Sequence, residues 1–405
     1  MDRPFARVIV SEKAEKSLKA GQVRVYGEET LALDGSVDGG GIVDVYSKKG
    51  KYLGSGFYNE ASKQRVRIVS KNPNDRFDGA FWRRRLQYAV DYRKSVMGDD
   101  FSCCRLIFGD ADGFPGLTVD RFGDVLVAEV LSYGCERIKA TLFDALDGIL
   151  ASLGETVSVI YERSDGAIRA LEGMLPATGA FLDRRPDPTA PYETTIVENG
   201  IAYRVDYGAG QKTGFFLDQR DNRARVGTMS AGRDVLNVFS FSGGFSLYAA
   251  RGGASSVCSL DADKHAIAAC ARHFELNSGH PNIRQCKHEG IVGDAFEVMH
   301  DLAKAKRRFG LVIVDPPSFA KSAAERDRAL HSYARLAALA DSLLKPGGTL
   351  VFASCSSRVS ADDLFPVVLA HTHVRELART GHAADHPALF PESHYLKCLY
   401  AEKLP

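Results

Sequence analysis

The stretch DVLNVFSFSGGFS, which spans Asp234–Ser246, decides the fold of this chain. It begins with an apolar run, passes through a loop rich in Ser and Gly, and continues into the apolar segment 245–250. This order predicts a strand, a loop and a helix. Glycines at the end of such a strand let the backbone approach a ligand beside a helix N-terminus. Gly243 and Gly244 suit that role, although an ordinary βα turn uses glycine for its backbone freedom alone.

Three further apolar segments each end in an acidic residue. Asp261 comes 17 residues after Gly244, near the spacing at which an acidic residue binds ribose hydroxyls. Asp294 ends the next segment, and Asp315 ends the apolar run of LVIVDPPSFAK, Leu311–Lys321. A glycine loop with three acids at strand ends predicts a site for a nucleoside that carries hydroxyl and amino groups. A dinucleotide is less consistent with the chain, because the motif G-x-G-x-x-G is absent from it.

Several motifs occur in a defined order along the chain. They are ADGFPGLTVDR (111–121), GQKTGFFLDQR (210–220), NVFSFSGGF (237–245), DPPSF (315–319), ADHP (384–387) and PESHYLK (391–397). Together they resemble the class I S-adenosylmethionine-dependent ribosomal RNA methyltransferases, in particular the large-subunit methyltransferase I family, in which a PUA domain precedes the catalytic domain. The resemblance spans most of the chain. KTGFFLDQR followed by DPPSF is its most specific part.

The resemblance and the residue pattern imply an α/β protein with three domains. Residues 1–75 contain short alternating runs and resemble an RNA-binding PUA-like β-barrel. Residues 76–190 are expected to form a small α+β central domain, which ends at the proline-rich linker Arg184–Pro191 because prolines interrupt helices and strand ladders. Residues 191–405 alternate strands with helices and predict a Rossmann-like class I methyltransferase domain with a mostly parallel, helix-covered sheet.

The composition excludes several classes of protein. The chain has 405 residues, of which 45% are hydrophobic and 25% charged, as in ordinary soluble proteins. No apolar run approaches the roughly 20 residues of a membrane span, and the N-terminus lacks a secretory signal, so we expect a cytoplasmic protein without membrane contact. The net charge of +1 provides no global attraction to nucleic acid, so RNA has to be bound by local basic patches.

Two clusters of basic residues are candidates for such patches, with a merely solvated surface as the alternative for each. The candidates are Lys48, Lys49, Lys51, Lys63, Arg65 and Arg67 in the β domain and Arg83–Arg85 on the helix that follows it.

One of the eight cysteines stands in a position that indicates chemistry. The cysteines contain no C-x-x-C pair, which indicates reduced thiols, and Cys286 with His288 is too small a set for a zinc site. Cys355, however, follows the apolar strand 349–353, which delivers it to the same strand-end edge as Asp315. Most free cysteines are simply small buried residues, but this location favours a reactive thiol.

A thiol and an acid facing one base are what methylation of cytosine C5 requires. A thiolate adds to C6, C5 becomes nucleophilic and takes the methyl group, and a base removes the C5 proton so that the thiol can leave. By resemblance, Cys355 matches the nucleophile, and Asp315 would bind the N3/N4 edge of a flipped cytosine. The DPP loop has no second cysteine, which leaves the proton-removing base open among Lys321, Ser318 and a water.

The cofactor expected at the strand-end edge is S-adenosylmethionine. We expect backbone groups around its methionine part from Ser240, Gly243 and Gly244. Asp261 would bind the ribose hydroxyls and Asp294 the adenine amino group. The other residues expected to line this pocket are Phe239, Ala295, Asp315 and Pro316.

Residues of two further motifs are expected near the same site. Three from the upstream motif would contact the methionine carboxylate or gate the pocket, with a lid held by ion pairs as an equal alternative: these are Lys212, Thr213 and Arg220. Three from the C-terminal motifs would line the base side, although a His-Pro turn is more often structural: these are Asp385, His386 and Lys397.

The resulting hypothesis is a methyltransferase that forms 5-methylcytosine in large-subunit (23S) ribosomal RNA, and family analogy suggests a homodimer. Methylation of an exocyclic amine is an alternative, because DPP followed by an aromatic residue holds amino groups, but here Ser318 intervenes and Phe319 comes one place late. Guanine N7 methylation, as in a sister family with similar KTGFF and DPP segments, is another and needs no thiol. An RNA-binding protein that keeps the cofactor fold without turnover also remains open. A small-molecule methyltransferase would not need the 190 or so residues ahead of the catalytic domain.

Overall fold

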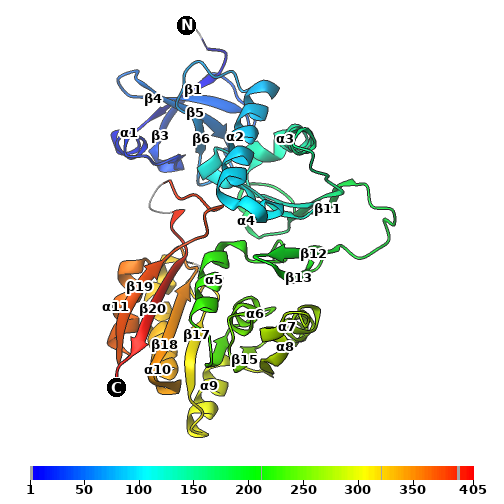
Figure 1. Cartoon of the computed structure of the whole chain (residues 1–405). Helices are drawn as coiled ribbons and strands as arrows, with labels where there is room; N and C mark the ends of the chain where they lie inside the picture. The colour runs from blue at the N-terminus through cyan, green and yellow to red at the C-terminus, as the bar shows by residue number, and fades with distance from the viewer. Residues whose placement is uncertain (1–2, 211, 321, 390–392) are drawn as a thin grey trace. The chain divides into compact units, whose positions relative to one another are not determined.

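The computed structural model describes residues 3–210, 212–320, 322–389 and 393–405 (Figure 1). The chain separates into two compact units. The first consists of residues 1–196, 205–216 and 384–390, and the second of residues 197–204, 217–383 and 391–405. Within the described residues, no helix is both long and apolar enough to cross a membrane.

The N-terminal part of the first unit is a six-stranded sheet with the order β2-β6-β5-β4-β1-β3. Its elements are β1 (Ala6–Val10), α1 (Glu12–Lys19), β2 (Arg24–Val25), β3 (Thr30–Asp34), β4 (Ile42–Ser47), β5 (Tyr52–Tyr58) and β6 (Val66–Ser70). The side chains between its strands and α1 form a separate apolar core, which includes Val8, Leu18 and Val45. The short alternating runs of the sequence thus become the strands of one small sheet.

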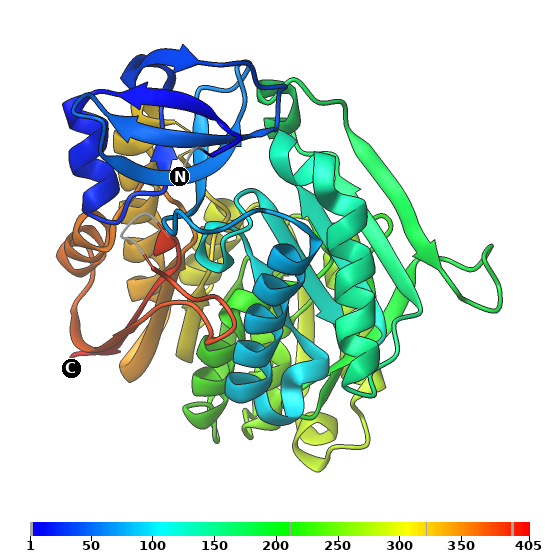
Figure 2. The same ribbon diagram turned by 90° about the horizontal axis from the view of Figure 1, so that it is seen from above.

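The rest of the first unit contains a five-stranded sheet with the order β11-β10-β9-β8-β7. Its elements are α2 (Gly79–Met97), β7 (Cys103–Phe108), β8 (Leu117–Phe122), β9 (Val125–Val130), α3 (Tyr133–Ser152), β10 (Val159–Ser164), α4 (Ile168–Leu171) and β11 (Ala177–Asp183). Helices α2 and α3 lie side by side, and their apolar faces share one buried cluster with the sheet (Figure 2). The hairpin β12 (Glu193–Glu198) and β13 (Ile201–Asp206) follows as a two-stranded sheet.

The second unit is built on a seven-stranded sheet with the order β16-β15-β14-β17-β18-β20-β19. Its strands are β14 (Asp234–Val238), β15 (Ser256–Asp261), β16 (Lys287–Val292), β17 (Phe309–Val314), β18 (Leu344–Ser354), β19 (Val374–Thr380) and β20 (Lys397–Lys403). Its helices are α5 (Arg220–Thr228), α6 (Gly244–Arg251), α7 (Lys264–Leu276), α8 (Pro281–Gln285), α9 (Ala295–Lys304), α10 (Arg326–Leu343) and α11 (Ala361–Ala370). This confirms the expected Rossmann-like fold.

The strand order reverses direction between β14 and β17. The five strands from β16 to β18 are parallel, and β20 runs antiparallel to its neighbours β18 and β19. In such a sheet the loops that leave β14 and β17 separate toward opposite faces, which opens a crevice at their carboxyl ends. The topology therefore places a ligand site where the Ser- and Gly-rich loop and the DPP loop begin.

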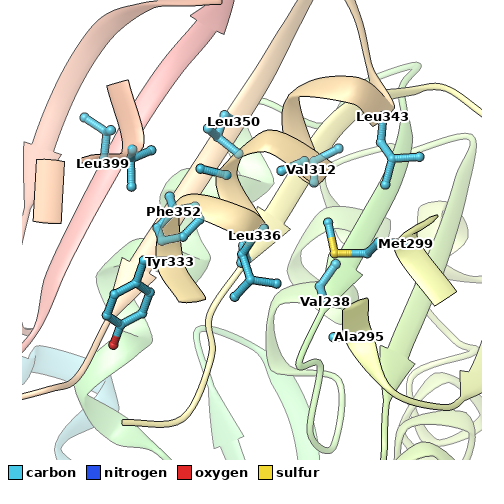
Figure 3. Close-up of a cluster of buried hydrophobic side chains, with 14 of the residues drawn as sticks. Val238, Ala295, Met299, Val312, Tyr333, Leu336, Leu343, Leu350, Phe352 and Leu399 are labelled. Atoms are coloured by element: carbon cyan, nitrogen blue, oxygen red, sulfur yellow. The ribbon is translucent and has the colours of Figure 1, made fainter. Parts of the chain in front are cut away.

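The strands of this sheet are apolar because helices cover them. Val238 and Val312 at the centre of the sheet contact side chains of α9 and α10, among them Met299 and Leu336 (Figure 3). Val312, Leu336 and Leu350 are fully buried. Parallel strands buried on both faces read as continuous hydrophobic runs, which is how the sequence revealed them.

A buried ion pair supports the helices next to the crevice. Arg223 on α5 donates two hydrogen bonds to Glu198, at 2.9 and 2.6 Å, and Tyr248 on α6 donates a third at 3.0 Å. The carboxylate of Glu198 is inaccessible to solvent. Removing one member of such a pair leaves the other charge buried and uncompensated.

We expect Arg223→Met to lower the free energy of unfolding by about 3–5 kcal/mol, measured by urea titration. The double variant Arg223→Met/Glu198→Met should recover part of that loss, because Glu198 is no longer buried without Arg223. The recovery should be incomplete, because the buried guanidinium of Arg220, 3.7 Å from Glu198, then loses its carboxylate. Arg375→Met, which breaks the exposed pair of Arg375 with Glu402 (2.6 Å), is the control and should cost less than about 1 kcal/mol. Equal losses for the buried and the exposed pair would contradict this account.

Candidate functional site

The loop after β14 has a constrained backbone. Phe239 and Phe241 adopt left-handed conformations, with φ of 60° and 47°, although neither is glycine. Such conformations cost about 1–3 kcal/mol each and persist only where surrounding contacts impose them. Here the Ser240 amide donates to the Leu260 carbonyl at 3.0 Å, and the Phe241 amide donates to the carboxylate of Asp261 at 2.8 Å. The loop is therefore held against the end of β15.

The packing of the fold explains why glycine occupies two positions of this loop. Gly243 has φ of 86° and forms the N-cap of α6, and a Cβ atom there would overlap the sulfur of Cys270. A Cβ atom at Gly244 would lie 3.0 Å from the Cδ atom of Arg223. Close packing of the loop on α5 and α7 thus accounts for both glycines, whether or not a ligand approaches their backbone.

Asp261 and Asp294 also stabilise the backbone around them. Asp261 ends β15, and its second oxygen accepts a hydrogen bond from the Asp263 amide at 2.9 Å. Asp294 is the N-cap of α9, where its Oδ1 atom accepts hydrogen bonds from the Phe296 and Glu297 amides at 2.9 and 3.1 Å. Both carboxylates lie at the ends of neighbouring parallel strands, as expected from the sequence.

The loop presents a buried polar atom that suits a ligand. The Ser240 hydroxyl is buried and has no hydrogen-bond partner among the described residues. Buried polar atoms are rarely left unpaired, so an unpaired one at a strand-end loop is consistent with a bound molecule. With the carboxylate of Asp261 on the next strand, the loop offers the groups that a nucleoside with hydroxyls requires. Phe239 and Ala295 lie beside it as partly buried and buried apolar residues, respectively.

Asp315 occupies the end of β17 in a largely desolvated position. Burial, and after it the negative charge of nearby Asp218, raises its pKa to about 7, against the opposing effects of a hydrogen bond from Gln219 and the charge of Arg223. The Gln219 amide donates to Oδ2 of Asp315 at 3.0 Å, and Asn222 donates to the Gln219 carbonyl at 2.6 Å, which orients the amide. A carboxyl group with a pKa near 7 can act as an acid or a base at neutral pH.

The sequence alone assigned no role to two residues of this environment. Gln219 and Asp218 belong to the KTGFFLDQR motif, and Asp218 accepts a hydrogen bond from the Tyr395 hydroxyl at 2.7 Å. Because these residues precede Asp315 by about 100 positions, only the fold shows that they share its environment. The KTGFFLDQR motif was the available sequence signal. It stands out as a whole, but the sequence does not show that two of its residues lie beside Asp315.

Cys355 lies at the end of β18, the strand that pairs with β17. All eight cysteines lie in described parts of the chain, and Cys355 alone is partly exposed. The hydroxyl of Tyr333 contacts Ser354 at 2.9 Å. Burial raises the pKa of Tyr333, and the charges of Cys355 and Asp315 add to this shift, against a hydrogen bond with Ser354 that lowers it. The structure thus brings the predicted thiol and acid to adjacent strand ends.

Lys397 holds the loop that carries Cys355. Its buried ammonium donates hydrogen bonds to the carbonyls of Ser356, Val359 and Tyr395, at 2.5, 2.6 and 2.9 Å. Burial lowers its pKa to about 8, against the opposing influence of Cys355. Because its three protons bind these carbonyls, Lys397 fixes the position of the loop that follows Cys355.

The three residues expected from the upstream motif have the following contacts. Thr213 donates to Asp120 at 2.6 Å within the first unit, and the ammonium of Lys212 lies 5.3 Å from the Phe216 ring centre. Arg220 lies in the buried cluster at 3.7 Å from Glu198. Lys321, a candidate base, lies outside the described residues.

The Asp385–His386 pair has a structural role in the first unit. Both side chains are buried, and they contact each other at 2.8 Å. Asp385 also accepts a hydrogen bond from the Arg105 amide at 2.8 Å. These contacts agree with a structural turn, the alternative that the sequence left open.

The described residues contain no group of three or more His, Cys, Asp or Glu side chains close enough to hold a metal ion. The candidate site consists of the loop after β14, the carboxylates of Asp261, Asp294 and Asp315, and the thiol of Cys355.

Comparison with known proteins gives consistent matches. Residues 185–393 match a family described as S-adenosylmethionine-dependent methyltransferase, and residues 8–71 match a PUA-like domain. A ribosomal RNA large subunit methyltransferase I of Klebsiella pneumoniae is 33% identical, and a ribosomal RNA large subunit methyltransferase of Deinococcus radiodurans is 36% identical, each over 98% of both chains. A methyltransferase crystallised with SAH shares the fold, with a TM-score of 0.82 and 24% identity over 98% of this chain and 99% of that one.

We expect Gly243→Ala to destabilise the protein more than Gly347→Ala, as measured by urea unfolding. Both glycines have positive φ, but a Cβ atom at Gly347 would meet nothing within 4 Å. The Gly347 variant should therefore cost only the backbone strain of about 1–2 kcal/mol, and the Gly243 variant an additional ~1–3 kcal/mol for overpacking against Cys270. Adding Cys270→Ala should recover part of that additional loss. Equal costs for the two glycines would show that the close packing is unimportant.

The stability of the protein should depend on Asp315 between about pH 4 and pH 7. The folded state binds the proton of Asp315 more tightly than the unfolded state, whose pKa is the usual 3.8. The associated stabilisation is complete below pH 4 and is lost as pH rises through 7, by up to about 4 kcal/mol. Asp315→Asn should remove this dependence. Urea unfolding at several pH values tests it, and parallel profiles for the two proteins would refute the raised pKa.

Proposed function

We propose that this chain transfers a methyl group to C5 of a cytosine in large-subunit ribosomal RNA through a covalent adduct with Cys355. The chain belongs to the S-adenosylmethionine-dependent methyltransferases and to the family of ribosomal RNA large-subunit methyltransferases. The observation that carries the proposal is the placement of a partly exposed thiol and a proton-binding acid at the ends of adjacent strands. Methylation of a nitrogen requires no such thiol.

The cofactor is S-adenosylmethionine, which supplies the methyl group from a positively charged sulfur. We assign its binding to the backbone of Ser240, Gly243 and Gly244 and to the carboxylates of Asp261 and Asp294. Phe239, Ala295 and Pro316 would contribute apolar walls. The unpaired hydroxyl of Ser240 supports this assignment, because a ligand would complete its hydrogen bonding.

In the proposed reaction, the thiolate of Cys355 forms a bond with C6 of the cytosine, and the displaced electron pair makes C5 nucleophilic. C5 then forms a bond with the methyl carbon as the bond from that carbon to sulfur breaks. Loss of the C5 proton to a base returns the electron pair, and the bond between C6 and Cys355 breaks. The charge of Cys355 raises the pKa of Lys397, against the effect of burial, so the two groups interact. The positive charge of Lys397 accordingly favours the thiolate form of Cys355 in the first step of the reaction.

Asp315 would supply the proton that the ring needs. Addition at C6 makes N3 more basic, so a neutral carboxyl group at N3 stabilises the adduct by donating its proton. A pKa near 7 keeps about half of the Asp315 side chains protonated at neutral pH. Its Oδ1 atom has no hydrogen-bond partner within the described part of the chain, and it is the oxygen we assign to the base.

The base that removes the C5 proton stays open. The hydroxyl of Ser318 donates to the Ala320 carbonyl at 3.1 Å, and this hydroxyl could accept the C5 proton only by giving up its own. A water or Lys321 would serve the same step.

The proposal predicts that Cys355→Ala abolishes 5-methylcytosine formation, measured by mass spectrometry of nucleosides from treated ribosomal RNA. Cys286→Ala, which removes a buried thiol, is the matched control and should leave the product unchanged. Binding of S-adenosylhomocysteine, measured by calorimetry, should be equal in all three proteins, because no cofactor contact is removed.

RNA that carries 5-fluorocytosine provides a second readout. The fluorine at C5 cannot leave as a proton does, so wild-type protein should remain covalently attached to this RNA in a denaturing gel, and Cys355→Ala should not. Undiminished 5-methylcytosine from the alanine variant would exclude the covalent reaction. Methylation at N4 or N7 instead would support the alternative amine or guanine reactions.

A further inference from the structure

A groove of about 740 Å³ opens directly beside the loop that carries Cys355. It begins at Ser356, the residue after the cysteine, and continues along the first residues of α11 to the end of β19 and the start of β20. Its lining consists of Ser356–Ala361, Asp363, Phe365, Arg379–Gly381, His394, Leu396 and Lys397. None of the residues assigned above to the cofactor belongs to it.

The sheet order fixes where this groove lies relative to the chemistry. The cofactor residues follow β14, β15 and β16, the acid and the thiol follow β17 and β18, and the groove surrounds the ends of β18, β20 and β19 at the same edge. Neighbouring strands are about 4.8 Å apart, so the groove begins within one or two strand spacings of Cys355. It therefore lies on the side of the thiol opposite the cofactor.

The groove has a surplus of positive charge. Arg358 is exposed, and no carboxylate lies within ion-pair distance of it among the described residues. Arg379 is neutralised by Glu376 through two hydrogen bonds of 2.9 Å, and Asp363 is neutralised by Arg326 from outside the groove. The remaining charged or titratable groups of the lining are the guanidinium of Arg358, the ammonium of Lys397 and the imidazole of His394.

The walls of the groove combine apolar and polar groups. Val359, Phe365 and Leu396 are buried and form its apolar part, and the exposed ring of His394 stands at its rim. Single-stranded RNA is recognised by stacking of its bases on aromatic rings and by cationic contacts to its phosphates. The volume suits a ligand of one or two nucleotides, since small-molecule sites span roughly 300–1,000 Å³.

Building on the reaction proposed above, we propose that this groove binds the RNA nucleotide adjacent to the methylated base, with Arg358 contacting its phosphate. The Arg358 amide donates to the Ser356 hydroxyl at 3.4 Å, so the phosphate contact and the nucleophile loop belong to one turn. Binding of the strand here would place the target base between the groove and the cofactor. Arg358 is thus a positioning residue and takes no part in bond making.

The test compares Arg358→Ala with Arg358→Lys and with Arg284→Ala in the full chain. Arg284 on α8 is also exposed, but α8 precedes β16 and lies at the opposite edge of the sheet. Binding of a single-stranded oligoribonucleotide is measured by fluorescence anisotropy at several salt concentrations. The plot of log Kobs against log salt has a negative slope, and loss of one phosphate contact in Arg358→Ala should make it shallower by about 0.7. Arg358→Lys should retain the slope, and Arg284→Ala should match wild type.

The catalytic readout separates this inference from the proposed reaction. Arg358→Ala should raise the KM for RNA several-fold with a smaller change in kcat, while calorimetric binding of S-adenosylhomocysteine stays unchanged. A slope equal to that of wild type, or one equally reduced in Arg284→Ala, overturns the groove assignment even if 5-methylcytosine forms normally. Absence of 5-methylcytosine from wild-type protein refutes the reaction instead, and an Arg358-specific loss of slope would still establish the RNA contact.

Discussion

The parallel pairing of β14 with both β15 and β17 is the constraint on which the site depends. It makes β14 the strand at which the sheet order reverses, so the glycine loop and the DPP loop leave the sheet on either side of one crevice. Pairing of β17 with β18 then brings Cys355 to the same edge as Asp315. The residues proposed to bind the cofactor, then Asp315 and Cys355, and then the groove consequently follow one another in the order of the strands.

Burial determines the chemistry available at this edge. Asp315 is a carboxyl group that the fold partly withdraws from water and places near the negative charge of Asp218, so its proton is retained to about pH 7. Gln219 donates one hydrogen bond to it, which orients the carboxyl group and limits the shift. Lys397 is also buried, and its ammonium persists because three carbonyls accept its protons. The same desolvation thus favours a neutral acid at one strand end and a rigidly held loop at the next.

Backbone strain and packing converge on the loop after β14. Phe239 and Phe241 adopt left-handed conformations that only the anchoring to Leu260 and Asp261 can maintain. Gly243 is required by both its positive φ and the sulfur of Cys270 behind it. This loop is therefore preformed by the protein, and a preformed site binds its ligand without the free-energy cost of ordering the loop.

The sequence by itself determined the class of fold, the cofactor and the candidate thiol and acid. Continuous apolar runs such as Leu311–Val314 are typical of strands covered on both faces, and the motifs that follow them carry the family resemblance. It did not reveal β11, β19 or β20. Strands β11 and β19 are largely exposed and have little hydrophobic signal, and β20, KCLYAEK, has only a short apolar run between charged residues. The tertiary structure alone decided that Gln219 orients Asp315, that Lys397 secures the Cys355 loop, and that Thr213 and Asp385 hold other parts of the chain together. These assignments depend on contacts between residues about 40 to 280 positions apart, and distances of that kind are set by strand order and packing, which local sequence patterns do not encode.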